Sequence, residues 1–133
     1  MANGVTICPY CGCGCGFHLQ SENNELTGII PNSNHPVSRG SLCIKGWKAY
    51  EFPNHPDRLD SPLIRKNGRL EKATWEEALS LVATKLMKIK DNYGSNSLGI
   101  CSSAKTFNEE NYLLQKFARS VLLTNNIDHC ARL

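Results

Sequence analysis

Long apolar runs are missing from this sequence. A helix that crosses a membrane needs about 18 consecutive apolar residues or more, and the 133 residues contain no such stretch. The N-terminus, Met1-Ala2-Asn3-Gly4-Val5-Thr6, lacks a basic segment followed by an apolar one, and it has no twin-arginine signal. We therefore expect a cytoplasmic protein with no membrane span.

A strong excess of charge is missing as well. The formal net charge is only +3, and the basic residues are spread along the chain. The longest basic cluster, Arg65-Lys66 with Arg69, straddles Asn67-Gly68 and is typical of a solvated turn. Nucleic-acid-binding proteins concentrate lysine and arginine on one face, so we expect no nucleic-acid partner.

An even number of cysteines, as a disulfide scaffold requires, is also absent. The chain has seven cysteines, and without a secretion signal clustered cysteines are more often metal ligands than disulfide partners. This clustering is the strongest signal in the sequence. Four of the seven lie within the eight residues 8–15, namely Cys8, Cys11, Cys13 and Cys15.

The cysteine spacing predicts a [4Fe–4S] cluster. Such a cluster takes four thiolates, and a C-x2-C-x3-C loop can place three sulfurs around it, with Cys43 as the nearby candidate for the fourth. Cys13 can replace Cys11 or Cys15, so the spacing leaves the ligand set open. We expect positive φ at the glycines of the loop, which directs N–H groups at the sulfurs. These glycines are Gly12, Gly14 and Gly16.

Zinc is the alternative metal for this loop. Cys8-Pro9-Tyr10-Cys11-Gly12 is similar to a zinc-ribbon knuckle, but a ribbon normally brings a second C-x2-C pair. Cys43 has no such companion, so the pattern favours the cluster. Lys45 follows Cys43 by two residues and is a candidate for supplying positive charge beside the cluster, with an ordinary surface lysine as the alternative.

Other reactive side chains carry weaker signals. The four histidines, His18, His35, His55 and His129, share no ligand spacing and are interpreted as structural or exposed. Cys101 lies in an apolar segment and is predicted to be a buried core residue. Cys130 is a candidate reactive thiol, although no base lies near it in sequence.

The first 60 residues predict short strands around the cysteine loop. Residues 5–7 are expected to form a brief strand, and residues 17–20 and 26–30 a hairpin. Ser41 is the predicted cap of a short helix that carries Cys43, Trp47 and Tyr50 and ends before Pro53.

From residue 61 the pattern changes to longer elements. Asn67-Gly68 predicts a tight hairpin over 63–70, and Thr74 with Glu77 predicts a capping box that opens a helix ending at Gly94. Strand 97–101, helix 108–122 and a strand from 127 onward are expected next. The expected apolar face of the first helix consists of Trp75, Ala78, Leu79, Val82, Leu86, Ile89 and Tyr93, and that of the second of Leu113, Leu114, Phe117 and Val121.

The expected fold class is mixed α+β and α/β. A small β-rich cluster domain over residues 1–60 precedes the start of an α/β domain over 61–133. A parallel sheet needs several strands and covered faces, and this pattern stops after two strands. We therefore expect the inner faces of the two helices to be exposed and the chain to be poorly stable without more polypeptide.

Several motifs together resemble a known family. Residues 6–12, Cys15-Gly16 and residues 40–46 resemble the N-terminus of molybdopterin oxidoreductases. Residues 108–112, 115–119 and 124–128 are similar to cytoplasmic formate dehydrogenase catalytic subunits. The resemblance implies that 61–133 begins a pterin-binding catalytic domain. It also implies a molybdenum or tungsten ion held by two molybdopterin guanine dinucleotides, with formate and carbon dioxide interconverted.

The resemblance also assigns residues. It implies that Cys8, Cys11, Cys15 and Cys43 are the cluster ligands and that Cys13 is a bystander thiol. Lys45 matches the family lysine that relays electrons between cluster and pterin. Asn126 and Arg132 lie close to the metal-binding position and are candidates for contacting pterin or substrate, although Arg132 can equally pair with a surface carboxylate. Implied partners are iron–sulfur subunits, a ferredoxin, or nicotinamide-linked or hydrogenase subunits.

The last residues carry a separate hypothesis. Residues 130–133 resemble the segment that precedes selenocysteine in selenium-containing, anaerobic members of the family. Because selenocysteine is encoded by UGA, we expect that codon to follow Leu133, and we expect the 133 residues alone to be inactive. Two alternative functions are considered. One is a stand-alone single-cluster electron-transfer module, which does not need the helices after Thr74, and the other is a zinc-binding module.

Overall fold

The computed structural model describes residues 2–130 of the chain. The described residues form two compact units, each with its own internal contacts. The first unit comprises residues 2–58, 102–113 and 129–130, and the second comprises 59–101 and 114–128. No helix among the described residues is long and apolar enough to cross a membrane.

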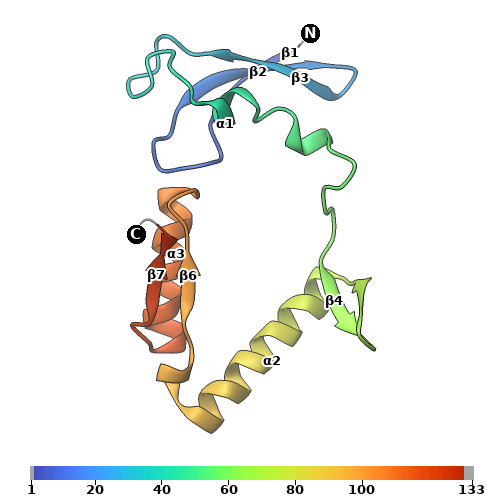
Figure 1. The fold of residues 1–133 in the computed structure, drawn as a ribbon, viewed down its shortest axis with the longest axis vertical. Helices are drawn as coiled ribbons and strands as arrows, with labels where there is room; N and C mark the ends of the chain where they lie inside the picture. The colour runs from blue at the N-terminus through green and yellow to red at the C-terminus, as the bar shows by residue number, and fades with distance from the viewer. Residues whose placement is uncertain (1, 131–133) are drawn as a thin grey trace. The chain divides into compact units, whose positions relative to one another are not determined.

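The first unit is built on a three-stranded antiparallel sheet. Strands β1 (Ala2–Ile7), β2 (Gly16–Glu22) and β3 (Glu25–Pro31) pair in chain order, with β2 in the centre (Figure 1). Asn23 and Asn24 form the β2–β3 turn with φ of 51° and 67°. Asparagine tolerates this left-handed conformation better than most residues, so the predicted hairpin forms here. The predicted strand at 5–7 is also confirmed and begins earlier, at Ala2.

A small core lies beside this sheet. Phe17, with 1% of its surface exposed, packs with Cys8, Ile29 and Ala49. Burying an aromatic side chain of this size stabilises a fold by about 1.5–3 kcal/mol. The core therefore holds the end of the cysteine loop to the sheet. Partly buried side chains around it are Tyr10, Cys15, Leu19, Leu42 and Tyr50.

The predicted helix after Gly40 is shorter than expected. Helix α1 spans Ile44–Trp47, and a 3-10 turn, η1, spans Phe52–Asn54. The prediction that Ser41 caps the helix is wrong, because the helix begins only at Ile44 and Ser41 belongs to the preceding turn, where its N–H donates to the Ser38 carbonyl at 2.8 Å. Cys43 takes the cap position instead, with φ −77° and ψ 169°.

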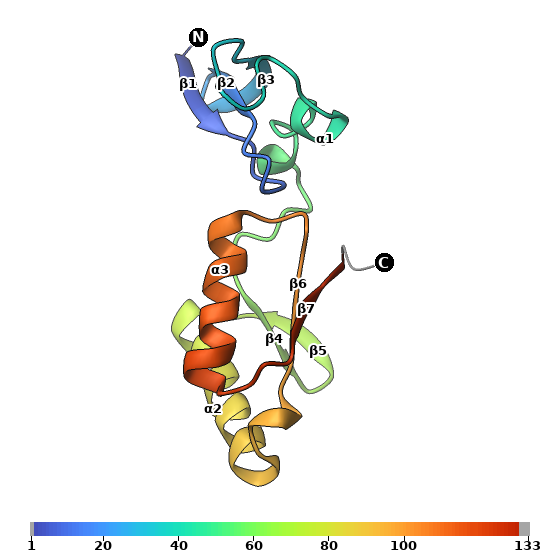
Figure 2. The ribbon, with the colours of Figure 1, turned by 90° about the vertical axis from the view of Figure 1, so that its left-hand side faces the viewer.

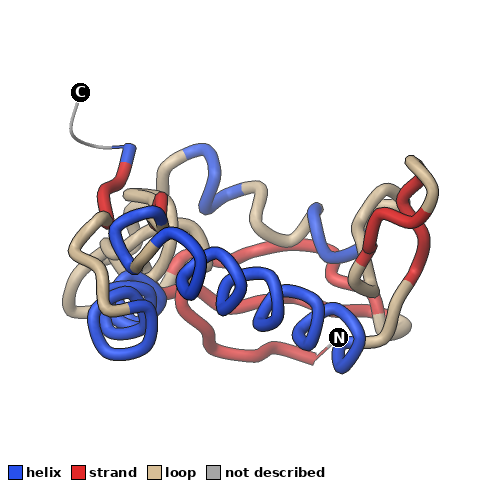
Figure 3. The backbone as a smooth tube through the Cα atoms, turned by 90° about the horizontal axis from the view of Figure 1, so that it is seen from below, coloured by secondary structure: helices blue, strands red, loops and turns tan. Residues whose placement is uncertain are grey.

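The second unit begins with a hairpin and a long helix. Strands β4 (Leu63–Lys66) and β5 (Arg69–Lys72) pair antiparallel around Asn67-Gly68, as predicted. Helix α2 (Trp75–Tyr93) starts at the predicted capping box: the Glu77 N–H donates to Thr74 Oγ1 at 3.1 Å, and the Thr74 N–H donates to Glu77 Oε2 at 2.8 Å. Gly94, at φ 82°, ends it. Figure 3 shows α2 and α3 in blue among strands and loops.

The apolar face of α2 is open to solvent. Trp75 is 68% exposed, Leu79 is 60% and Tyr93 is 75%, and none of the described α2 residues is fully buried. A face of this composition ordinarily packs against a protein core. The expectation that this face is exposed is confirmed.

The remaining elements form a strand–helix–strand unit. A 3-10 turn, η2 (Ser95–Ser97), precedes strand β6 (Ile100–Ser102). Helix α3 (Asn108–Phe117) then continues as a π-helical segment, η3 (Ala118–Leu122), and leads to strand β7 (Ile127–His129). Strands β6 and β7 are hydrogen-bonded neighbours. Figures 1 and 2 show them running in the same direction beside α3, which is the arrangement that opens an α/β sheet.

Three details of this part differ from the sequence-based expectations. The strand begins at Ile100 rather than residue 97, because Ser95–Ser97 make a 3-10 turn with Ser97 N–H on the Gly94 carbonyl. Cys101 is exposed, so the prediction of a buried core thiol is wrong. The buried side chains of the second helix are Ala118 and Leu122, which the expected inner face did not include; Leu113, Phe117 and Val121 of that face are exposed, as expected, and Leu114 is half-buried.

Candidate metal centre

The cysteine loop joins β1 to β2 and closes on itself. The Cys8 N–H donates to the Cys15 carbonyl at 2.8 Å, so the two ends of the loop lie side by side. Within it, the Gly14 N–H donates to the Cys11 carbonyl at 3.3 Å. Because the sheet fixes both ends, residues 8–15 form a compact loop that carries four thiols on one short segment.

The three glycines of the loop serve different purposes. Among the described loop residues, only Gly14 has positive φ, at 60°. The expectation of positive φ at Gly12 and Gly16 is therefore wrong. A Cβ on Gly12 would collide with the Asn108 side chain, and a Cβ on Gly16 would collide with the His35 ring. Gly12 and Gly16 are therefore needed because neighbouring side chains leave no room for a Cβ at these positions.

Cys43 lies at the start of α1, outside the loop. The backbone N–H groups of Gly46 and Lys45 lower the pKa of its thiol, and the Lys45 charge lowers it further. Cys43 makes no side-chain capping hydrogen bond that meets the usual geometric limits. An exposed thiol with a lowered pKa is readily available as a thiolate ligand.

Cys43 and the loop thiols share one electrostatic environment. Burial raises the pKa of Cys8, and the neighbouring Cys11 and Cys43 raise it further, although the Tyr10 N–H opposes them. Burial also raises the pKa of Cys15, with additional repulsion from Cys8, Cys11 and Cys43. Repulsion between thiolates falls off with distance. The thiols of Cys8, Cys11, Cys15 and Cys43 therefore lie near enough for the charge of one to affect the ionisation of another, while their assignment as cluster ligands stays a prediction.

Cys13 belongs to the same group of thiols. A hydrogen bond with the Cys11 thiol raises the pKa of Cys13, and nearby Cys11, Cys15 and Cys43 add to the effect. The side chain is exposed, unlike that of Cys8. Five thiols therefore gather where a cluster needs four, so the assignment of Cys11 rather than Cys13 as a ligand stays a prediction.

Lys45 lies close to this group. Its charge lowers the pKa of both Cys8 and Cys43. The side chain is half-buried rather than extended into solvent. A cation in this position favours negative charge on the sulfurs, as the predicted role beside a cluster requires, and that role stays a prediction.

The donor set fits a cluster. Thiolates are the ligands of [4Fe–4S] centres, each bound to its own iron. N–H groups from Tyr10, Lys45 and Gly46 face the sulfurs, which matches the outer-shell hydrogen bonding of such centres. The fit is one of donor type, because within residues 2–130 no three cysteine, histidine or acidic side chains are placed to hold a metal ion together.

The other predicted site residues lie elsewhere. Asn126 belongs to the second unit, where its amide donates to the carbonyls of Asn96 at 2.9 Å and Leu98 at 3.2 Å. These bonds tie two backbone segments together. Arg132 lies outside the described residues, so both assignments stay predictions.

Two supports of the loop were not evident from the sequence. Ser38 is buried and accepts from the Gly16 N–H at 3.2 Å, while His35 Nδ1 lies 3.3 Å from the Ser38 hydroxyl. This contact confirms the structural interpretation of His35. The second support is Asn108, whose amide donates to the Gly12 carbonyl at 3.2 Å. No spacing rule predicts contacts across 22 and 96 residues.

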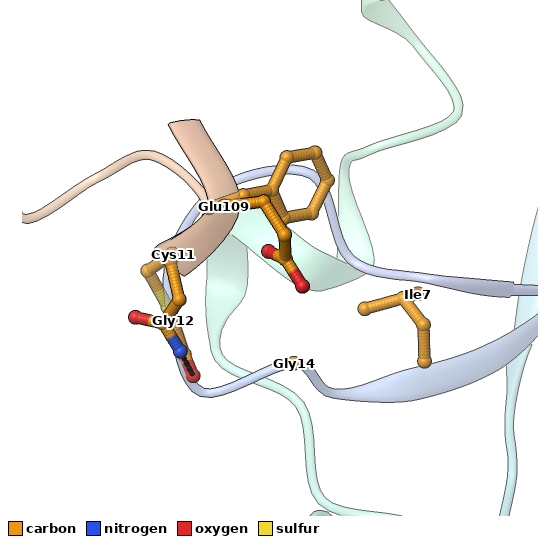
Figure 4. A pocket seen from close by; sticks show the side chains of 7 residues that line it. Ile7, Cys11, Gly12, Gly14 and Glu109 are labelled. Atoms are coloured by element: carbon orange, nitrogen blue, oxygen red, sulfur yellow. Dashed lines mark hydrogen bonds between the residues drawn. The ribbon is translucent and has the colours of Figure 1, made fainter. Parts of the chain in front are cut away.

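A cavity of about 330 Å³ lies beside this second support (Figure 4). Figure 4 shows the loop passing Cys11, Gly12 and Gly14, with Glu109 on the facing helix. The residues preceding and opening α3 form the other wall. They are Phe107, Asn108 and Glu109.

A thiol-rich loop on a small sheet, followed by a strand–helix–strand unit of the α/β kind, defines an iron–sulfur protein with a second domain. Residues 1–55 match the family domain described as the molybdopterin oxidoreductase Fe4S4 domain, and residues 58–133 match the one described as molybdopterin oxidoreductase. The chain belongs to the molybdopterin oxidoreductase family. The two matched domains identify a [4Fe–4S] cluster and a molybdopterin as the cofactors.

Individual relatives agree with this assignment. The chain is 53% identical over 128 residues to F420-dependent formate dehydrogenase 1 subunit alpha of Methanococcus maripaludis, and 50% identical over 128 residues to F420-dependent formate dehydrogenase subunit alpha of Methanocaldococcus jannaschii. Both alignments cover 96% of this chain and 18% of the relative. The chain therefore spans about a fifth of the length of these curated relatives.

A solved structure shows the same fold. Acetylene hydratase from Pelobacter acetylenicus superposes with a TM-score of 0.74 at 26% sequence identity. The match covers 94% of this chain and 18% of that protein. The mixed α and β fold class is therefore confirmed, while the predicted boundary near residue 60 stays a prediction.

Proposed function

We propose that this chain is the N-terminal portion of a formate dehydrogenase catalytic subunit. The supporting observation is the 53% identity to a formate dehydrogenase alpha subunit, which extends across 96% of the chain and so covers both family domains. In the complete polypeptide, formate and carbon dioxide are interconverted at molybdenum or tungsten held by two pterin guanine dinucleotides. The cluster, when bound, supplies one-electron transfer.

Within this proposal, Cys8, Cys11, Cys15 and Cys43 hold the cluster. The repulsion that neighbouring thiolates exert on Cys8 and Cys15, and the N–H groups directed at Cys8 and Cys43, support the assignment. Three ligands come from the loop that the sheet closes, and the fourth comes from the start of α1. This division fixes the loop ligands relative to one another and leaves Cys43 to complete the site.

Lys45 is proposed as the cation between cluster and pterin. The Lys45 charge lowers the pKa of Cys8 and of Cys43, which supports a position of this side chain next to the cluster. A fixed positive charge stabilises the more negative, reduced cluster. Asn126 and Arg132 are proposed as residues near the pterin on the resemblance alone.

The electron partner belongs to the proposal too. Iron–sulfur subunits, a ferredoxin, and nicotinamide-linked or hydrogenase subunits all suit a one-electron cluster. The two archaeal relatives are named F420-dependent, which adds an F420-linked partner to this group. A cytoplasmic location and an anaerobic setting accompany the proposal.

Formate-dependent reduction of a viologen dye by the complete, anaerobically purified polypeptide tests the substrate. We expect activity with formate and none with acetate of equal concentration. Metal analysis of the same sample distinguishes molybdenum from tungsten. A cluster-loaded, pterin-loaded protein that leaves the dye oxidised in the presence of formate contradicts the proposed substrate.

Cysteine variants test the ligand set separately. Cys43→Ser is expected to lose most of the about four iron and four sulfide per chain that a [4Fe–4S] protein carries, together with the brown absorbance. Cys13→Ser is the matched control, and it is expected to retain both. Unchanged iron and absorbance in Cys43→Ser contradicts the assignment. The expected UGA codon after Leu133 stays a prediction that the downstream nucleotide sequence checks.

A further inference from the structure

Asn108 links two segments of the first unit that are far apart in sequence. It is the first residue of α3 and opens the Asn-Glu-Glu-Asn-Tyr motif at 108–112. Its side-chain amide donates to the Gly12 carbonyl at 3.2 Å, across 96 residues of chain (dashed in Figure 4). Gly12 lies between Cys11 and Cys13, so the bond is made to the middle of the thiol loop.

The loop is shaped to accept this side chain. A Cβ on Gly12 would overlap the Asn108 amide group. Gly14 is the described loop glycine with positive φ, so an alanine at position 12 meets no backbone strain of that kind. The absence of a side chain at Gly12 therefore makes room for Asn108.

This bond fixes the orientation of one peptide group. A trans peptide is planar, so its C=O and N–H point in opposite directions. When Asn108 holds the Gly12 carbonyl, the Cys13 N–H is held on the opposite side. That peptide is the second one after Cys11 and ends at the Cys13 nitrogen, so it lies between two thiols of the loop. Peptide N–H dipoles near cluster sulfurs are one of the means by which proteins set a cluster's reduction potential.

We propose that Asn108 is a positioning residue for the cluster: its amide holds the Gly12–Cys13 peptide beside Cys11 and thereby sets the reduction potential of the centre. The inference rests on the cluster within the proposed function and is independent of formate as the substrate. Asn108 touches neither iron nor sulfur in this role and acts through the loop backbone.

Asn108→Leu in the complete, cluster-loaded protein tests the proposal, because leucine has a similar size and cannot donate. We expect iron content to be retained and the midpoint potential, followed by EPR in a redox titration, to fall. The expected change is about tenfold in the ratio of reduced to oxidised cluster at a fixed potential, or about 59 mV. Asn92→Leu, the same change at an exposed position of α2, is expected to leave the potential unchanged.

Gly12→Ala supplies a second variant that leaves Asn108 in the sequence. The added methyl group should displace the Asn108 amide and shift the potential in the same direction. Because both substitutions remove one interaction, the double variant should shift no further than either single variant. This non-additivity separates the bond from general damage to the loop.

The outcomes are distinct. Wild-type potentials and EPR spectra in both single variants overturn the proposal, as do shifts that simply add in the double variant. If Asn108→Leu does not retain iron, the result with Gly12→Ala decides alone. A shifted potential in a protein that does not oxidise formate supports the positioning role and contradicts only the proposed substrate.

Discussion

Cys8 shows how one residue combines two environments. It is 4% exposed and packs with Phe17, Ile29 and Ala49, yet its thiol is a proposed cluster ligand. Burial raises the pKa of this thiol, while the Tyr10 N–H and the Lys45 charge lower it. A bound iron replaces the thiol proton and removes the conflict. The surrounding core then holds the ligand in place.

Lys45 carries a prediction at the same scale. Replacing Lys45 with glutamine removes a positive charge beside Cys8 and Cys43, so the reduced cluster loses stabilisation. We expect the midpoint potential to fall by on the order of 50 mV. Lys48→Gln is the matched control, because Lys48 instead pairs with Glu51 at 2.6 Å on the surface. Equal potentials for the wild type and Lys45→Gln would exclude the role.

Cys130 makes a pH-dependent prediction. The Ala104 N–H, the Ser103 hydroxyl and the Lys105 charge lower the pKa of its thiol, whereas the pKa of Cys13 is raised. A lowered pKa means that the thiolate is present at lower pH. In cluster-free protein, alkylation of Cys130 by iodoacetamide should therefore begin at lower pH than that of Cys13. Peptide mass spectrometry across about pH 6 to 10 measures both.

The Ser103 hydroxyl lies 3.7 Å from the Cys130 sulfur. Its contribution to the lowered pKa of Cys130 can be tested apart from those of Ala104 and Lys105. Ser103→Ala should move the Cys130 alkylation profile to higher pH. Ser97→Ala, whose hydroxyl donates to the Gly94 carbonyl, should not. Coincident profiles for Cys13 and Cys130 would contradict the prediction.

Helix α2 shows how local interactions start an element. Thr74 and Glu77 satisfy each other's backbone N–H groups, and the Thr74 N–H and hydroxyl lower the pKa of the Glu77 carboxyl. Since the folded pKa is depressed, this contribution to stability is present above the unfolded value of about 4.3. It is lost as the pH falls through the folded value.

Thr74→Ala tests this start. Loss of the cap should lower the free energy of unfolding by about 1 kcal/mol, measured by urea denaturation at neutral pH. Thr84→Ala, an exposed position within the same helix, should be neutral or slightly stabilising because alanine is the better helix former. The Thr74 effect should shrink below about pH 4 as Glu77 becomes protonated. Similar losses from both variants would contradict the capping role.

At the scale of the whole molecule, the described residues leave much of their apolar surface uncovered. Residues across α2 and α3 remain open, among them Trp75, Leu79 and Tyr112 at 68%, 60% and 62% exposure. Surface of this kind ordinarily drives association. The chain covers only 18% of its relatives, and under the proposed function we expect further polypeptide to pack against these faces.

The exposed face gives two opposite expectations. The 133 residues alone should self-associate, as measured by sedimentation, and should bind the dye ANS, as measured by fluorescence. The double substitution Leu79→Glu and Val82→Lys should reduce the self-association and the dye binding. In the complete polypeptide the same pair should lower the melting temperature, because charges then enter a buried contact. A monomeric chain that binds no dye, or an unchanged melting temperature in the complete protein, contradicts this view.

The sequence by itself determined the local features of this protein. Asn67-Gly68, the Thr74–Glu77 box and the β2–β3 turn act over a few residues, so their chemistry decides their conformation. The clustered thiols indicated the cluster for the same reason, because ligand type and spacing are read along the chain.

Only the tertiary structure decided what distant residues do together. The Gly12–Asn108 contact, the Gly16–Ser38 bond and the proximity of Lys45 to Cys8 join segments that no spacing rule links. Burial behaves likewise: Cys101 lies in an apolar segment yet is exposed, because burial depends on what packs against a strand. Local sequence sets backbone preferences, whereas contacts and exposure depend on the whole arrangement of the chain.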